Sequence, residues 1–278
     1  MALGKLGTQL KASLVGTLKG AGDVVTGAMD VTRQTLVTAL RGAGDVGNAL
    51  TGSVADVVGG AVEAAGEVGR SATDVVKGTV VGVIRAVGEI TTVTAGVLSD
   101  TVRAAIRGTK DVGGDVTEAA RSTAQGAIAA TRDVALGIGE AAFGVARGAI
   151  LGVKDVGGDL GATAQSAMQG SLRGAKDIGA DATDTARHTA RGLVNGAAEV
   201  GGDVARVAKG AVTGAIRGAR DIGVGVEEAA AAAATGAAEA AQDVGEAAVK
   251  AVSGVLSETI EGVRVVAHAP FGKSRKRA

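Results

Sequence analysis

The sequence predicts an all-α repeat protein, and two observations carry this prediction. An acidic residue followed by Val or Ile recurs every 22 residues along almost the whole chain. Within each unit, apolar residues recur at helical spacing and not in the alternation that is typical of strands. A constant period of this length indicates that one supersecondary unit is repeated many times. The acidic positions are Asp23, Asp45, Glu67, Glu89, Asp111, Asp133, Asp155, Asp177, Glu199, Asp221 and Asp243.

Counting back to Met1 gives twelve units of 22 residues, which end at Arg264 without an insertion or deletion. We therefore divide the chain into a repeat region, 1–264, and a basic tail containing Pro and Gly, 265–278. Twenty-two is twice eleven, and eleven residues make three helical turns at about 3.67 residues per turn. Wound at this pitch, each unit gathers its apolar residues on one arc and most of its charges on the other. Each unit is predicted to form an amphipathic helix with a wide, shallow apolar face.

Glycine makes such a helix weak on its own. The chain has 47 glycines, and glycine holds position 16 of the unit in nine of the twelve units. Each interior glycine costs about 0.8–1 kcal/mol relative to alanine. The apolar face is therefore predicted to need another surface to lie against. The position-16 glycines are Gly16, Gly60, Gly82, Gly126, Gly148, Gly170, Gly192, Gly214 and Gly236.

Two arrangements of the twelve units satisfy this need. The unbroken phase favours a long continuous helix or long hairpins, because loops usually accumulate changes in length. In the alternative, the glycine after each acidic pair ends a helix at the C′ position, and short antiparallel helices stack with glycine turns between them. Asp115 and Glu118 have the spacing of a capping box that would start such a helix. The glycine pairs at 113–114, 157–158 and 201–202 would serve the turns.

The composition argues against an enzyme. The chain has no Cys, Trp or Tyr and two Phe, so it lacks the bulky residues that fill most globular cores. It contains no Walker loop, no HExxH and no nucleophile elbow. His188 and His268 are isolated, which does not fit a standard zinc site. We expect no catalytic, cofactor or metal site.

Charge and hydropathy bound the partners. The 29 basic and 29 acidic residues balance, which makes nucleic acid an unlikely partner. No apolar segment approaches the roughly 18 residues of a transmembrane helix, and the N-terminus lacks the apolar core of a signal peptide. We expect a cytoplasmic protein without a transmembrane span, peripheral to a lipid or granule surface.

The tail breaks the repeat. Pro270 is the single proline of the chain, and it ends a helix wherever it falls in one. A basic cluster that follows it is suited to phosphate contact, and a disordered, solubilising terminus is the alternative. The basic residues are Lys273, Arg275, Lys276 and Arg277.

The undecad pattern resembles known lipid-binding repeats. Segments such as TGAMDVTRQTLVTAL at 26–40 and GSVADVVGGAVEAAGEV at 52–68 are rich in Gly, Val, Thr and Ala, with scattered charges. They resemble the amphipathic repeat region of perilipins and synucleins, although the synuclein KTKEGV core is absent. The pattern is also similar to group 3 late-embryogenesis-abundant proteins. The first resemblance implies a helix that coats a lipid surface, and the second implies a stress protectant.

We therefore expect a non-enzymatic protein that coats a membrane, lipid droplet or storage granule through its apolar stripe, where interfacial helix formation offsets the glycine penalty. The alternatives are self-assembly into a helical filament or bundle, since Gly and Ala columns let helices approach closely, and stress protection. The partner is thus a lipid surface or a second copy of the chain. The stripe residues expected to make the contact are Val24, Leu36, Leu40, Val46, Val58, Ile84, Ile106, Ile128, Ile150 and Ile216.

Overall fold

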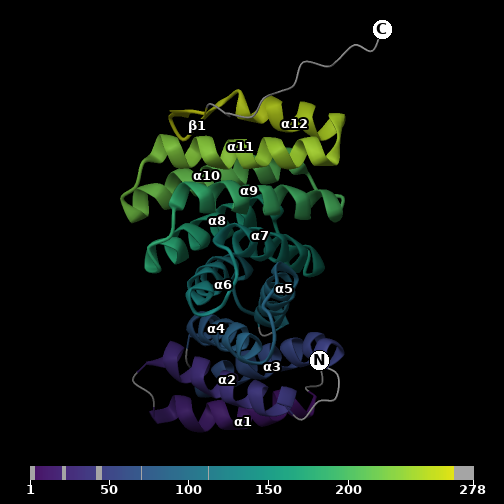
Figure 1. The fold of residues 1–278 in the computed structure, drawn as a ribbon, viewed down its shortest axis with the longest axis vertical. Helices are drawn as coiled ribbons and strands as arrows, with labels where there is room; N and C mark the ends of the chain where they lie inside the picture. The colour runs from purple at the N-terminus through teal and green to yellow at the C-terminus, as the bar shows by residue number, and fades with distance from the viewer. Residues whose placement is uncertain (1–3, 21–22, 42–45, 70, 112, 266–278) are drawn as a thin grey trace.

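In a computed structural model, the chain forms a stack of helices that runs from α1 at one end to α12 at the other (Figure 1). The structure describes residues 4–20, 23–41, 46–69, 71–111 and 113–265. The all-α prediction is confirmed. The helices are α1 (Lys5–Gly20), α2 (Val24–Arg41), α3 (Val46–Val68), α4 (Ala72–Ile90), α5 (Ala95–Asp111), α6 (Val116–Ala130), α7 (Ile138–Asp155), α8 (Leu160–Asp177), α9 (Ala182–Glu199), α10 (Val204–Ile222), α11 (Val226–Val244) and α12 (Glu246–Leu256).

The favoured expectation of a long continuous helix or long hairpins is wrong, because each unit ends its own helix. The helices α7 to α11 begin at residues 138, 160, 182, 204 and 226, one period apart. Helix α8 is 18 residues long, which is five turns at about 3.6 residues per turn. Each helix therefore ends on the face where it began, and the rest of the unit forms the turn. The constant phase reflects turns of constant length.

The turn from α7 to α8 shows how the sequence stops one helix and starts the next. Gly157 has φ of 69°, in the left-handed region that favours glycine. The N–H of Gly158 donates to the carbonyl of Val153 at 2.9 Å, as in a Schellman motif. The Asp159 carboxylate then caps α8 by accepting from the N–H groups of Gly161 and Ala162, at 2.8 and 3.1 Å. Stacked short helices with glycine turns, the alternative arrangement, describe this part of the chain.

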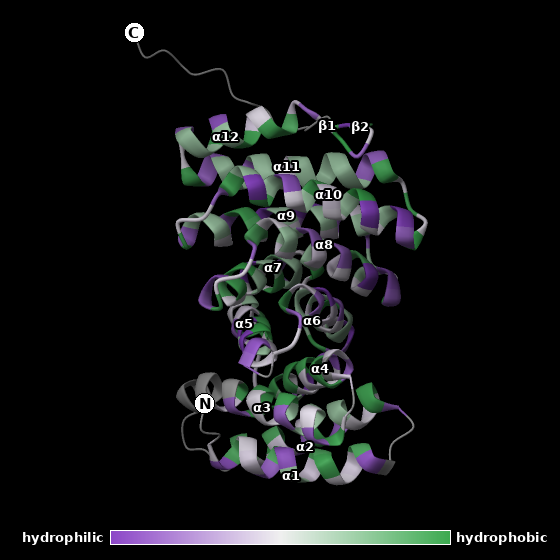
Figure 2. Cartoon of the chain, turned by 180° about the vertical axis from the view of Figure 1, so that it is seen from behind, coloured by the Kyte–Doolittle hydropathy of each residue, from purple (hydrophilic) through white to green (hydrophobic). Residues whose placement is uncertain are grey.

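The helices form two layers. Each helix makes its most extensive contacts with the helix two places along, so odd-numbered and even-numbered helices form separate layers (Figure 1). Successive turns lie at alternate ends of the stack, and neighbours in sequence run in opposite directions. Hydrophobic residues run through the middle of the stack, and hydrophilic residues gather at the helix ends and turns (Figure 2).

The last unit departs from the repeat and closes the stack. Helix α12 has 11 residues, and a hairpin of β1 (Thr259–Ile260) and β2 (Val263–Arg264) follows it. The hairpin contacts α10 and α11. Glu261 in its turn pairs with Arg217 at 2.7 Å and with Arg220 at 3.8 Å. Polar terminal units of this kind are what a repeat array needs at its ends.

Candidate functional site

Neither a metal centre nor a membrane-spanning helix is found in the described part of the chain. No group of three or more His, Cys, Asp or Glu residues there is placed to hold a metal ion. None of the helices within the described ranges is long and apolar enough to cross a membrane. His188 stays within its own helix, α9, where its Nδ1 lies 3.0 Å from the Asp184 carbonyl oxygen and 3.2 Å from the Asp184 carboxylate. His268 lies outside the described residues.

The predicted contact stripe is covered by the chain's own helices. Val24 is half-buried and packs against the core. The side chain of Val46 lies outside the described residues. The other eight residues are buried in the hydrophobic core: Leu36, Leu40, Val58, Ile84, Ile106, Ile128, Ile150 and Ile216.

Glycine gives the stack its close helix contacts. A Cβ added at Gly174 in α8 would lie 2.6 Å from the carbonyl oxygen of Gln125 in α6, a distance that no side chain tolerates. A Cβ at Gly170 would overlap the Arg121 carbonyl in the same way. The glycines therefore let two helix backbones touch, as small residues do wherever helices approach closely. The position-16 column signalled this role, but the sequence alone did not identify the surface that the glycines touch.

A ladder of ion pairs joins helices two places apart in the odd layer. Arg103 in α5 donates two hydrogen bonds to Asp155 at the end of α7, at 2.6 and 3.0 Å. The same step of 52 residues joins Arg147 to Glu199 at 2.8 Å and Arg191 to Asp243 at 2.9 Å.

The acid of each pair is the periodic acid of the sequence, here at or next to the end of its helix. A carboxylate at a helix C-terminus is disfavoured by the helix dipole. The hydrogen bond from Arg103 offsets this and lowers the pKa of Asp155, and the same bond raises the pKa of Arg103. We had expected a solvated face, and its pairing partner two helices away was not predicted.

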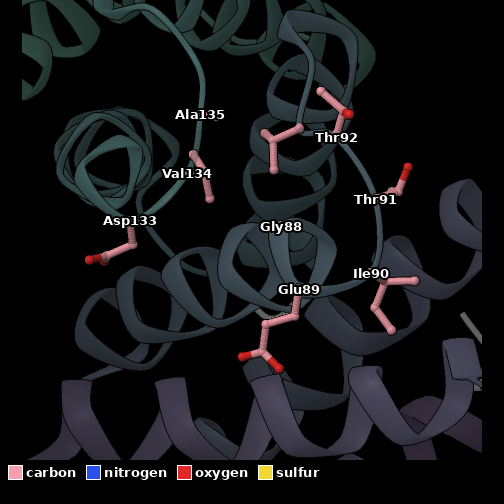
Figure 3. Close-up of a pocket in the computed structure, with 9 residues that line it drawn as sticks. Gly88, Glu89, Ile90, Thr91, Thr92, Asp133, Val134 and Ala135 are labelled. Atoms are coloured by element: carbon pink, nitrogen blue, oxygen red, sulfur yellow. The ribbon is translucent and has the colours of Figure 1, made fainter.

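One cleft lies between the end of α4 and the segment after α6 (Figure 3). It encloses about 430 Å³ and is lined by residues 88–93 and 133–135. Its two acids are already paired, Glu89 with Arg33 and Asp133 with Arg85, both at 2.7 Å. The side chains of Glu89, Asp133 and Thr91 point in different directions in Figure 3. The cleft brings no set of functional groups to one point.

The basic residues of the tail, Lys273, Arg275, Lys276 and Arg277, lie outside the described residues. Their expected contact with phosphate stays a prediction.

Comparisons with known proteins give a fold likeness and no family. The sequence matches no known protein-family profile and no curated protein. Among solved structures, it is similar to the crystal structure of a de novo designed helical repeat protein, DHR7, with a TM-score of 0.37 and 21% sequence identity. That similarity covers 63% of this chain and 97% of the designed chain.

Proposed function

We propose that this chain is a non-enzymatic structural scaffold, a helical-repeat rod that holds its shape without lipid. The observation that carries the proposal is the burial of the stripe. Residues such as Leu36, Ile106 and Ile216 are covered by neighbouring helices of the same chain. The partner that the glycine-rich helices need is thus supplied within the chain, and burial in a repeat array adds unit by unit.

The outer surface fits a scaffold better than an adhesive coat. Among the described residues, the large hydrophobic side chains classed as exposed are Val224 and Val244, 39% and 44% exposed. The surface elsewhere carries ion pairs such as Arg173–Asp221 at 2.8 Å. A monomeric soluble protein without a contiguous apolar patch offers little for a lipid interface to bind.

A lipid coat through the same stripe is the competing function. It requires each helix to leave its neighbours, because the stripe cannot face a lipid surface and the core together. Helix formation at an interface would then replace the helix contacts described above. Self-assembly between chains would replace them with the same contacts made in trans.

Far-UV circular dichroism and light scattering in buffer, with and without phosphatidylcholine vesicles and neutral-lipid emulsions, separate these functions. The scaffold predicts a strongly helical monomer whose spectrum depends neither on protein concentration nor on lipid. A coil that becomes helical only on lipid would overturn the scaffold in favour of the coat. Helicity that rises with protein concentration would favour assembly between chains.

A matched pair of variants ties the result to the helix contacts. Gly170→Val places a side chain against the Arg121 carbonyl, whereas the side of Gly16 has open space within 4 Å. The scaffold predicts loss of cooperative unfolding in Gly170→Val and its retention in Gly16→Val. Equal behaviour of the two variants would contradict it.

A further inference from the structure

The register between stacked helices changes once along the chain. In the N-terminal helices, a Cβ at Gly82 of α4 would lie 2.6 Å from the carbonyl of Met29 in α2, 53 residues earlier. In the C-terminal helices, Gly174 faces Gln125, 49 residues earlier. The difference of four residues is about one helical turn. The chain thus consists of an N-terminal array, residues 4–90, and a C-terminal array, residues 95–265.

The helix pairs that join the two arrays lack the close glycine contact. Helix α5 carries Ala104 where most units have the position-16 glycine. A Cβ at Gly108 of the same helix would meet only a Val58 side chain of α3, at an ordinary 3.5 Å. On the even layer, a Cβ at Gly126 of α6 would be 3.2 Å from the nearest carbonyl, that of Lys77 in α4. Both pairs are packed less tightly than the pairs within either array.

The connection between the arrays is also irregular. Helix α4 ends at Thr91, which has extended backbone with φ of −152° and ψ of 179°, in place of a left-handed glycine. Residues 91–94 then continue outside any helix. The cleft in Figure 3 opens at this place, between residues 88–93 and 133–135. Few packed atoms oppose a change of angle here.

One ion pair bridges the cleft. Arg85 of α4, in the N-terminal array, donates from Nε and Nη2 to one Asp133 carboxylate oxygen, at 2.9 and 2.7 Å. Among the ion pairs of the described residues, it is the one that connects the two arrays. Both side chains are more than a third exposed, so salt and solvent weaken the bond.

From these observations we propose that residues 91–94 are a hinge between two rigid arrays, with the Arg85–Asp133 pair as the latch that holds the cleft closed. The arrays keep their internal registers while the angle between them changes. The inference goes beyond the scaffold function but needs the folded arrays that it assumes.

The hinge is tested with spin-label distances measured by pulsed electron paramagnetic resonance. The chain has no cysteine of its own, so labels attach only where cysteine is introduced. Ser13→Cys with Thr183→Cys places exposed labels in different arrays. Ala162→Cys with Ala247→Cys places both exposed labels in the C-terminal array. The hinge predicts a broader distance distribution for the first pair than for the second.

Two further variants and a control test the latch. Asp133→Asn should broaden only the distribution between arrays, and 0.5 M salt should do the same. Asp155→Asn breaks a comparable Arg–Asp pair inside the C-terminal array and should leave both distributions unchanged. Ala104→Gly restores the repeat glycine and should narrow the distribution between arrays. Equally narrow distributions that do not respond to Asp133→Asn would overturn the hinge.

Circular dichroism of every labelled sample distinguishes failure of the hinge from failure of the scaffold. A chain that is not helical in buffer gives broad distributions for both label pairs and overturns the scaffold as well. A helical chain with two narrow distributions overturns the hinge alone.

Discussion

The N-terminal and C-terminal arrays use one period to build two different interfaces. In the N-terminal array the buried residues include large side chains such as Leu14 and Leu36. In α11 of the C-terminal array nearly every buried residue is alanine or glycine. The glycine contacts differ by one helical turn between the arrays. The period therefore determines the helix and its turn, whereas the residues at the contact determine how neighbouring helices slide against each other.

The largest effect is expected where the N-terminal array depends on a large side chain. Leu36 is fully buried, and Leu36→Ala removes its contacts and leaves a cavity, which costs about 2–5 kcal/mol. Urea unfolding monitored by circular dichroism measures this loss. Thr38→Ala, an exposed site on the same helix, should change the free energy of unfolding by less than about 0.5 kcal/mol. Similar losses in the two variants would show that Leu36 is not packed.

The next effect should distinguish glycines by their neighbours. Gly170→Ala forces a methyl group against the Arg121 carbonyl, and such overpacking costs about 1–3 kcal/mol. Gly16→Ala has open space around it and gains helix propensity, so it should stabilise the chain by up to about 1 kcal/mol. The two substitutions are chemically identical, and their opposite signs in urea unfolding test the contact directly. A stabilising Gly170→Ala would contradict the close approach.

A smaller effect is expected at a helix start in the C-terminal array. Asp159→Ala removes the cap of α8 and should cost about 1 kcal/mol in urea unfolding. Asp159→Asn keeps an oxygen that accepts the same hydrogen bonds, so it should retain most of the stability. Equal losses would assign the effect to the Arg206–Asp159 ion pair at 2.5 Å and not to the cap.

The smallest effect concerns pH. The pKa of Asp155 is lowered in the folded chain, so between the folded and unfolded values the folded state binds fewer protons. The pair's contribution is therefore complete above about pH 4 and is lost as the pH falls through the folded pKa. A partly exposed pair is worth about 0.2–1 kcal/mol. Urea unfolding at pH 7 and pH 3 should show a loss of this size, and Asp155→Asn should remove it.

A control for this measurement is Asp111, the equivalent acid at the end of α5. It makes no ion pair with any residue that the structure describes. Asp111→Asn should leave the stability at pH 7 unchanged. A loss at pH 7 as large as that of Asp155→Asn would contradict the role of Arg103.

Much of the fold was readable from the sequence because its turns carry specific residues. The expected capping residue Asp115 does accept from the N–H groups of Thr117 and Glu118. Gly113, Gly157 and Gly201 do have positive φ. The balance between a long helix and short ones was misjudged, since a helix of five turns preserves phase as well as an unbroken helix does.

The candidate site was less readable. Periodicity identifies an apolar face such as that of Ile106 or Ile150, but not whether lipid, another chain or the same chain covers it. The partner of a position-16 glycine lies 49 or 53 residues away, and a repeat offers many equivalent partners. Choosing among them requires the backbone separation, which depends on packing throughout the stack.

The contacts between stacked helices have a direction along the chain. Gly174 of the later helix rests on a carbonyl of the earlier one, and Asp155 of the later helix is neutralised by Arg103 of the earlier one. A ribosome releases the earlier helix first. Each emerging helix therefore finds its carbonyl platform and its arginine already folded, and an array built in this way can grow during translation without waiting for its C-terminus.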